Sequence, residues 1–180
     1  MRRALLLPLA TAGCLLPLVP SDAPDTADTD GTVSGCSGGF VEPTSANARI
    51  LSLTVAGQAV PTSFRPDATR AGEPALCVSP DGTAARIVIS GANGPLGLLS
   101  VTTPGATGTF SLTSDATVDL ILDGLSPSVI VNSSGWDAGE LDVTSVGTQL
   151  TFDLSTAAGS DVNGTRVSLS ATLTAAVPLP

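Results

Sequence analysis

The residues best suited to chemistry cluster around the chain's single tryptophan, in the segment Ser134-Gly-Trp-Asp-Ala-Gly139. Trp136 is followed closely by Asp137 and Glu140. Glycoside hydrolysis uses a pair of carboxyl groups, and an indole ring beside them can stack on a sugar. Trp136, Asp137 and Glu140 are therefore the predicted ligand-binding positions. We prefer a simpler interpretation, in which the acids lie in a turn and on a solvated strand face and the ring covers the end of a sheet.

The rest of the chemical inventory argues against an enzyme. The chain has no histidine, lysine or tyrosine. It therefore lacks the commonest general base near neutral pH and the amine that forms Schiff bases. Because no catalytic motif, cofactor motif or metal motif is present, we predict a non-enzymatic protein without a cofactor or bound metal. A carboxylate-dependent glycan hydrolase using Asp137 and Glu140 is the alternative.

Three strand acids offer a further alternative function. Asp119, Asp142 and Asp153 occupy alternating positions in apolar segments, so they can lie on one solvated sheet face. Carboxylate oxygens are the usual ligands of Ca²⁺, which makes a calcium-dependent adhesion module the third hypothesis. Solvated strand faces are the better interpretation.

The N-terminus has the layout of a secretion signal over residues 1–20. A positive start, Met1-Arg2-Arg3, precedes an apolar run that ends in small residues. The segment Thr11-Ala12-Gly13-Cys14 resembles the lipobox of bacterial lipoproteins, although the family usually has leucine where Thr11 stands. The resemblance implies that Cys14 becomes the lipidated first residue of an exported bacterial envelope protein, which is anchored in the outer membrane or lies in the periplasm or at the cell surface. Cleavage by ordinary signal peptidase after Ala12 or Ser21 remains the alternative.

Lipidation of Cys14 would leave two cysteines for a disulfide. Cys36 and Cys77 then form an even pair in an oxidising compartment, and we predict that they are bonded. The segment that follows Cys14 is also strongly acidic, since five arginines face 16 acidic residues from there to the C-terminus. Such a chain repels phosphate backbones, so nucleic acid is not an expected partner. The expected partners are the membrane, through the lipid, and an envelope protein or glycan.

Residues 21–39 are rich in Asp, Thr, Gly and Ser and are predicted to be a linker, followed by a single β-domain at 40–180. Within that domain apolar and polar residues alternate, as at Leu51–Val55, Val118–Leu122 and Val167–Leu173. Turn signals separate these runs at spacings of about ten residues. The pattern predicts about nine or ten short antiparallel strands, each with one buried and one solvated face. A β-sandwich is the expected fold, with a closed antiparallel barrel as the alternative.

In the second half of the chain, two predicted strands begin with the same pattern, a glycine followed by two apolar residues at alternate positions. Gly108-Thr-Phe110-Ser-Leu112 and Gly139-Glu-Leu141-Asp-Val143 share it. In this respect the region from Leu51 to Val177 resembles exported bacterial lipoproteins of unknown function. The resemblance implies an all-β fold but no activity and no site. Together, the sequence predicts an exported, lipid-anchored β-sheet protein with a structural or binding role at the cell envelope.

Overall fold

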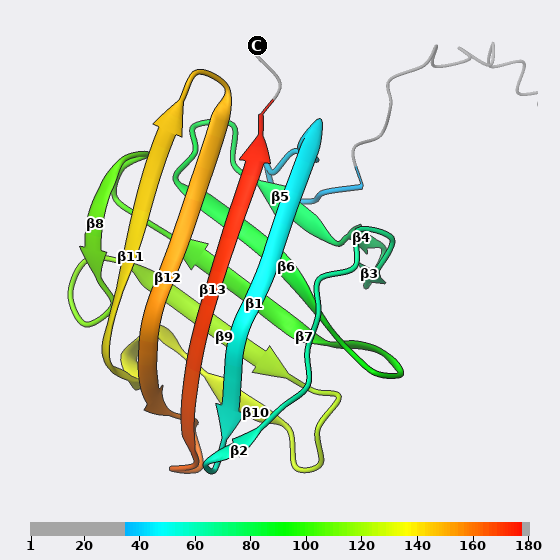
Figure 1. Ribbon diagram of the computed structural model, residues 1–180, viewed down its shortest axis with the longest axis vertical. Coiled ribbons are helices and arrows are strands. Elements are labelled where there is room, and N and C mark those ends of the chain that lie inside the picture. The colour runs from blue at the N-terminus through cyan, green and yellow to red at the C-terminus, as the bar shows by residue number, and fades with distance from the viewer. Residues whose placement is uncertain (1–34, 178–180) are drawn as a thin grey trace, which may run out of the picture. The chain divides into compact units, whose positions relative to one another are not determined.

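The computed structural model describes residues 35–177, so the predicted signal, Cys14 and most of the predicted linker lie outside the described residues. The described chain is a β-sandwich of two antiparallel sheets, and neither sheet closes on itself (Figure 1). The predicted sandwich is therefore confirmed, and the alternative of a closed barrel is wrong. Within the described part, no helix has the length and apolarity needed to cross a bilayer.

The larger sheet has six strands in the order β2-β1-β13-β12-β11-β8. Four of them are much longer than the short strands that the turn spacing predicts. The strands, in sheet order, are β2 (Gln58–Ala59), β1 (Ser45–Val55), β13 (Arg166–Ala176), β12 (Gln149–Ser160), β11 (Trp136–Val146) and β8 (Gly108–Ser111).

The second sheet has five strands in the order β10-β9-β7-β6-β5 and runs obliquely behind the first (Figure 1). A small two-stranded sheet, β3-β4, lies in the connection between β2 and β5. The bounds are β3 (Thr69–Arg70), β4 (Glu73–Pro74), β5 (Leu76–Val78), β6 (Ala84–Gly91), β7 (Gly94–Thr102), β9 (Thr117–Leu122) and β10 (Val129–Val131).

One apolar core fills the space between the two sheets. Alternate residues of the long strands point into it, as the period of two requires: Val167, Leu169, Ala171 and Leu173 of β13 are all buried. The same core contains Leu120 and Leu122 from β9 of the other sheet. The burial of these side chains between the sheets is the main stabilising contribution to the fold.

Three strands of the six-stranded sheet change their inward side partway along. In β1 the register shifts between Ile50 and Ser52, and in β12 it shifts between Leu154 and Ala157. β11 has two shifts between Trp136 and Glu140. These are β-bulges, which bend a strand and reverse the side to which its residues point. We call this row of bulges the crease of the six-stranded sheet.

The crease explains one wrong expectation. Leu51 was expected to share the buried face with Leu53 and Val55, but its side chain is 56 % exposed. Ile50 pairs with Ala171 and Leu53 pairs with Leu169, so β1 has one more residue than β13 over this interval. Leu51 lies in that bulge and therefore points away from the core.

Candidate functional site

Trp136 lies inside the sandwich. It follows the 3-10 turn η1 (Ser133–Gly135) and begins β11, and only 4 % of its surface is exposed. The indole Nε1 donates a hydrogen bond to the carbonyl oxygen of Val118 in β9, at 2.7 Å. Trp136 thus connects the two sheets. Its ring is unavailable at the surface for stacking on a sugar, which removes the observation that suggested a ligand site there.

The residue of β12 that pairs with Trp136 must be a glycine. Gly159 of β12 pairs with Trp136, and a Cβ atom at Gly159 would lie 2.2 Å from the carbonyl oxygen of Gly135. Only glycine fits such a close approach of two backbones. The local sequence therefore positions Trp136 for packing.

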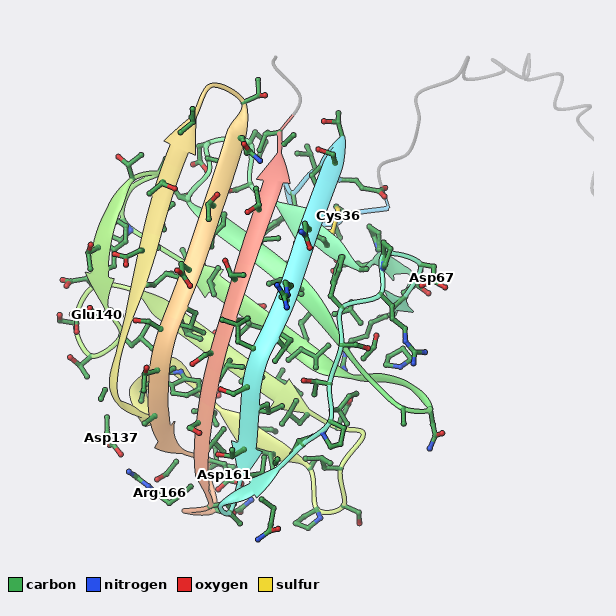
Figure 2. The ribbon with its side chains drawn as sticks, in the orientation of Figure 1. Cys36, Asp67, Asp137, Glu140, Asp161 and Arg166 are labelled. Carbon is green, nitrogen blue, oxygen red and sulfur yellow. A yellow bond between two sulfur atoms is a disulfide. The ribbon has the colours of Figure 1, made fainter. Side chains whose placement is uncertain are left out.

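Asp137 and Glu140 do not form a converging pair. Both are exposed, and the bulges of β11 lie between them. Figure 2 shows them at different levels of the strand, with Asp137 beside Arg166. The Nη1 of Arg166 donates to Asp137 Oδ2, and also to Ser160 Oγ at 3.1 Å. Asp137 therefore has an ion-pair partner at the end of the sheet, where it links β11 to β13.

The predicted trio of strand acids is divided between the two sheets. Asp142 of β11 pairs directly with Asp153 of β12 on the outer face of the six-stranded sheet. Asp119 belongs to β9 in the other sheet, where its carboxylate accepts a hydrogen bond from the backbone N–H of Ser133 at 3.0 Å. The expectation that all three share one face is wrong, because period-two alternation does not reveal which sheet a strand joins.

Asp142 and Asp153 instead line a groove of about 610 Å³ beside the short edge strand β8. Thr109 Oγ1 donates a hydrogen bond to Asp142 Oδ1 across the β8–β11 pair. The groove offers hydroxyl groups and carboxylates from Thr107, Thr109, Asp142, Thr144, Ser145, Thr151 and Asp153. Such a surface suits a polar ligand rich in hydroxyl groups, or a cation. Among residues 35–177 no group of three or more His, Cys, Asp or Glu side chains is arranged to hold a metal ion.

The predicted disulfide is confirmed. Cys36 and Cys77 are bonded, and their Cα atoms are 5.7 Å apart. The bond fastens the start of the described chain to β5, at the edge of the five-stranded sheet. Next to it, Val41 pairs with Val78 through two backbone hydrogen bonds of 2.8 and 2.9 Å. The end of the predicted linker is thus attached to the sandwich.

Side-chain contacts reinforce this attachment. The guanidinium of Arg86 lies over the ring of Phe40, 4.1 Å from its centre, and pairs with Glu73 at 3.4 Å. Ser37 Oγ donates to the same Glu73 carboxylate. Arg86, on the outer face of β6, therefore connects Phe40 to the β4 strand.

Among the described residues, three carboxyl groups have a pKa that differs from the ordinary value, and in each of them the pKa is lowered, which is opposite to what a catalytic acid needs. A general acid at neutral pH needs a raised pKa. The side-chain hydrogen bond from Thr83 lowers the pKa of Asp81, and the hydrogen bond from Arg70 lowers that of Asp123. Burial acts to raise the pKa of Asp161, but hydrogen bonds from the backbone N–H groups of Thr165 and Asn163 outweigh it and leave the pKa lowered. All three carboxylates hold turns or ion pairs.

A row of aliphatic residues on the outer face of the five-stranded sheet was not predicted from the sequence. Val88, Leu98, Ile121 and Ile130 are cross-strand neighbours in β6, β7, β9 and β10. Val88 is only 2 % exposed, and the other three are half-buried. The signal was present in the sequence: Ile87-Val88-Ile89 has no polar residue at the position expected to face water.

Comparisons with protein families, with curated proteins and with solved structures gave no significant match. A function for this chain must therefore be argued from its own residues, since an all-β fold alone does not indicate one.

Proposed function

We propose that the chain is a non-enzymatic, exported β-sandwich protein, anchored to the membrane through lipid on Cys14, with a structural or binding role at the cell envelope. The Cys36–Cys77 disulfide carries this proposal. Structural disulfides persist in oxidising compartments and are rare in the cytosol. The bond closes a loop with a sequence separation of 41 and joins the segment nearest the proposed anchor to the sheet.

The candidate aromatic and acidic residues have structural contacts, and these contacts support a non-enzymatic role. Trp136 packs between the sheets, and Asp137 pairs with Arg166. The full sequence supplies no histidine, lysine or tyrosine for acid–base or nucleophilic chemistry. A glycan-cleaving activity that disappeared in an Asp137→Asn, Glu140→Gln double variant would overturn this part of the proposal.

The anchor is tested by labelling the full chain with palmitate in bacterial cells. We expect label on the wild type and none on Cys14→Ala. The matched control is Cys36→Ser with Cys77→Ser, which removes two cysteines and keeps Cys14, and is expected to retain the label. Persistence of label in Cys14→Ala, or reduced thiols at Cys36 and Cys77 in freshly lysed cells, would contradict the proposal.

Calcium-dependent adhesion is a second candidate, favoured by one observation. Asp142 and Asp153 are direct cross-strand partners in an open groove, and two carboxylates so placed repel each other unless a cation lies between them. If Ca²⁺ binds there, millimolar Ca²⁺ raises the melting temperature of the wild type and not that of Asp142→Asn. An unchanged melting temperature in the wild type would reject this candidate.

A further inference from the structure

β1 is an edge strand for most of its length. It pairs with β13 from Ser45 to Val55. On its other side, within the described residues, Thr54 and Val55 pair with β2, and the carbonyl oxygen of Leu53 accepts a hydrogen bond from the backbone N–H of Val60 at 2.9 Å. The stretch Ser45–Ile50 precedes the bulge and keeps a regular register with β13. It spans roughly 20 Å at about 3.4 Å per residue. An open edge of this length presents backbone groups that an added strand can pair with.

Two pockets lie along this edge, one at each end. The first, of about 180 Å³, is beside Ser45 and Ala46 and is lined on its far side by Phe64, Pro66 and Leu76. The second, of about 330 Å³, is beside Ile50 and Leu51 and includes Val60 and Pro61. When a strand is added to a sheet, backbone hydrogen bonds supply affinity and pockets for alternate side chains supply specificity. This edge has both.

The charge of β1 itself is opposite in sign to that of the protein, and the acidic residue at this edge is Glu42, in the lining of the first pocket. β1 contains one charged residue, Arg49, and no acidic residue, in a chain with 16 acidic residues and seven basic ones. Arg49 is exposed and forms no ion pair with a described residue, whereas Arg70, Arg86 and Arg166 each do. A carboxylate on an added strand would meet Arg49 on the outer face.

We propose that the Ser45–Ile50 edge of β1 is a docking site for an extended peptide segment of a partner protein. The segment has two apolar side chains on one face, spaced to enter the two pockets, and a carboxylate between them on the other face, opposite Arg49. A second copy of the chain fits less well. Antiparallel pairing of two β1 edges brings two Arg49 side chains close together and joins two acidic proteins.

The test uses chain purified from cells that express the full-length protein, with a fluorescein-labelled peptide of sequence Val-Thr-Ser-Glu-Ser-Thr-Val as the probe. The peptide is palindromic, so it presents the same side chains in either strand direction. We expect saturable binding by fluorescence anisotropy and slower hydrogen exchange of backbone amides in Ser45–Leu53. Arg49→Glu should weaken binding roughly tenfold, because attraction becomes repulsion, and a lysine-for-glutamate peptide should restore it. The matched control, Arg166→Glu, makes the same change of charge at an exposed position of β13, at the other end of the sheet from Ser45, and should leave the affinity for the peptide unchanged.

Backbone pairing is separated from simple charge attraction by a fully N-methylated peptide, which we expect not to bind. Equal binding of the N-methylated peptide, unchanged exchange in Ser45–Leu53, or no saturable binding at millimolar peptide would each overturn the proposal. Concentration-dependent dimerisation that protects the same amides without peptide would overturn it in favour of self-pairing.

Discussion

The outer faces of the two sheets differ in a way that the inner faces do not. On the six-stranded sheet a cross-strand row consists of Thr109, Asp142, Asp153, Thr172 and Arg49. On the five-stranded sheet the comparable row consists of Val88, Leu98, Ile121 and Ile130. Both inner faces contribute to one core. A sheet with one solvated face alternates cleanly in sequence, whereas a strand covered on both faces reads as a continuous apolar run.

The largest expected effect comes from the residue that joins the two sheets. Trp136→Ala removes a buried ring and its hydrogen bond to Val118, and we expect it to lower the free energy of unfolding by about 3–5 kcal/mol. Trp136→Phe retains most of the packing but leaves the Val118 carbonyl oxygen without its donor, at a cost of about 1–3 kcal/mol. Urea unfolding measures both variants. A loss below 1 kcal/mol in Trp136→Ala would show that the sheets do not depend on this connection.

The disulfide fastens the start of the described chain to β5 of the five-stranded sheet. Replacing Cys36 by Ser and Cys77 by Ala removes a cross-link with a sequence separation of 41, and the chain-entropy model predicts a loss of about 4 kcal/mol. Chemical denaturation of the oxidised wild type, the reduced wild type and the double variant measures this loss. The reduced wild type should resemble the variant; if it matches the oxidised protein instead, the bond contributes little.

A reciprocal pair of near-isosteric substitutions tests the difference between the outer faces directly. Val88→Thr places a hydroxyl group in a position that is 2 % exposed, and we expect it to cost about 1–3 kcal/mol. Thr172→Val, on the other outer face, should change the free energy of unfolding by less than about 0.5 kcal/mol. Equal effects in thermal unfolding of the two variants would mean that the faces are equally solvated.

The smallest effect is expected at turn carboxylates, and it depends on pH. Asp161 accepts hydrogen bonds from the backbone N–H groups of Asn163 and Thr165 at 2.9 and 2.6 Å, and its pKa is lowered. A lowered native pKa gives stability that is fully present above the ordinary aspartate pKa of about 3.9 and is lost as the pH falls through the native value. Asp161→Asn should therefore melt below the wild type at pH 7, with the gap shrinking toward pH 3. A gap that is constant with pH would contradict the role of the charge.

Asp81 provides the matched carboxylate on the other sheet. It lies in the turn between β5 and β6, where it accepts hydrogen bonds from the backbone N–H and the hydroxyl group of Thr83 at 3.1 and 2.7 Å. Its pKa is also lowered, but it is exposed, whereas Asp161 is buried. The change in melting temperature of Asp81→Asn between pH 7 and pH 3 should have the same sign and a smaller size.

Much of the fold followed from local pattern. Alternation predicted the strands at Leu51–Val55, Val118–Leu122 and Val167–Leu173, which lie within β1, β9 and β13, because the period of two is a property of each strand by itself. The disulfide could be predicted because the assignment of Cys14 to a lipid leaves Cys36 and Cys77, which can pair in one way only. The two-residue strands β2, β3 and β4 had no such signal, since a pattern needs more than two residues to repeat.

The predictions about the candidate site were wrong where the position of a residue depends on neighbours distant in sequence. Trp136 was a candidate ligand-binding residue because Asp137 and Glu140 lie near it in the sequence, but its position is set by Val118 and Gly159 from other strands. The groove at Asp142 and Asp153 exists because β8 ends the sheet beside β11. The open edge of β1 likewise arises from strand order, which local hydrophobicity does not contain.

The crease divides the six-stranded sheet into two halves. The bulges lie at the same level of the sheet, so the inward-pointing residues of adjacent strands stay aligned in both halves. Inward residues of β12 have even numbers up to Leu154 and odd numbers from Ala157, while β13, which is continuous, keeps odd numbers throughout. Deleting Leu51 from β1, or one residue at Thr156 in β12, would therefore invert one half of a single strand and leave its neighbours unchanged. An insertion or deletion within one of these strands has to be matched by a change in the adjacent strands. The lengths of the strands are therefore much harder to alter than the lengths of the hairpin loops.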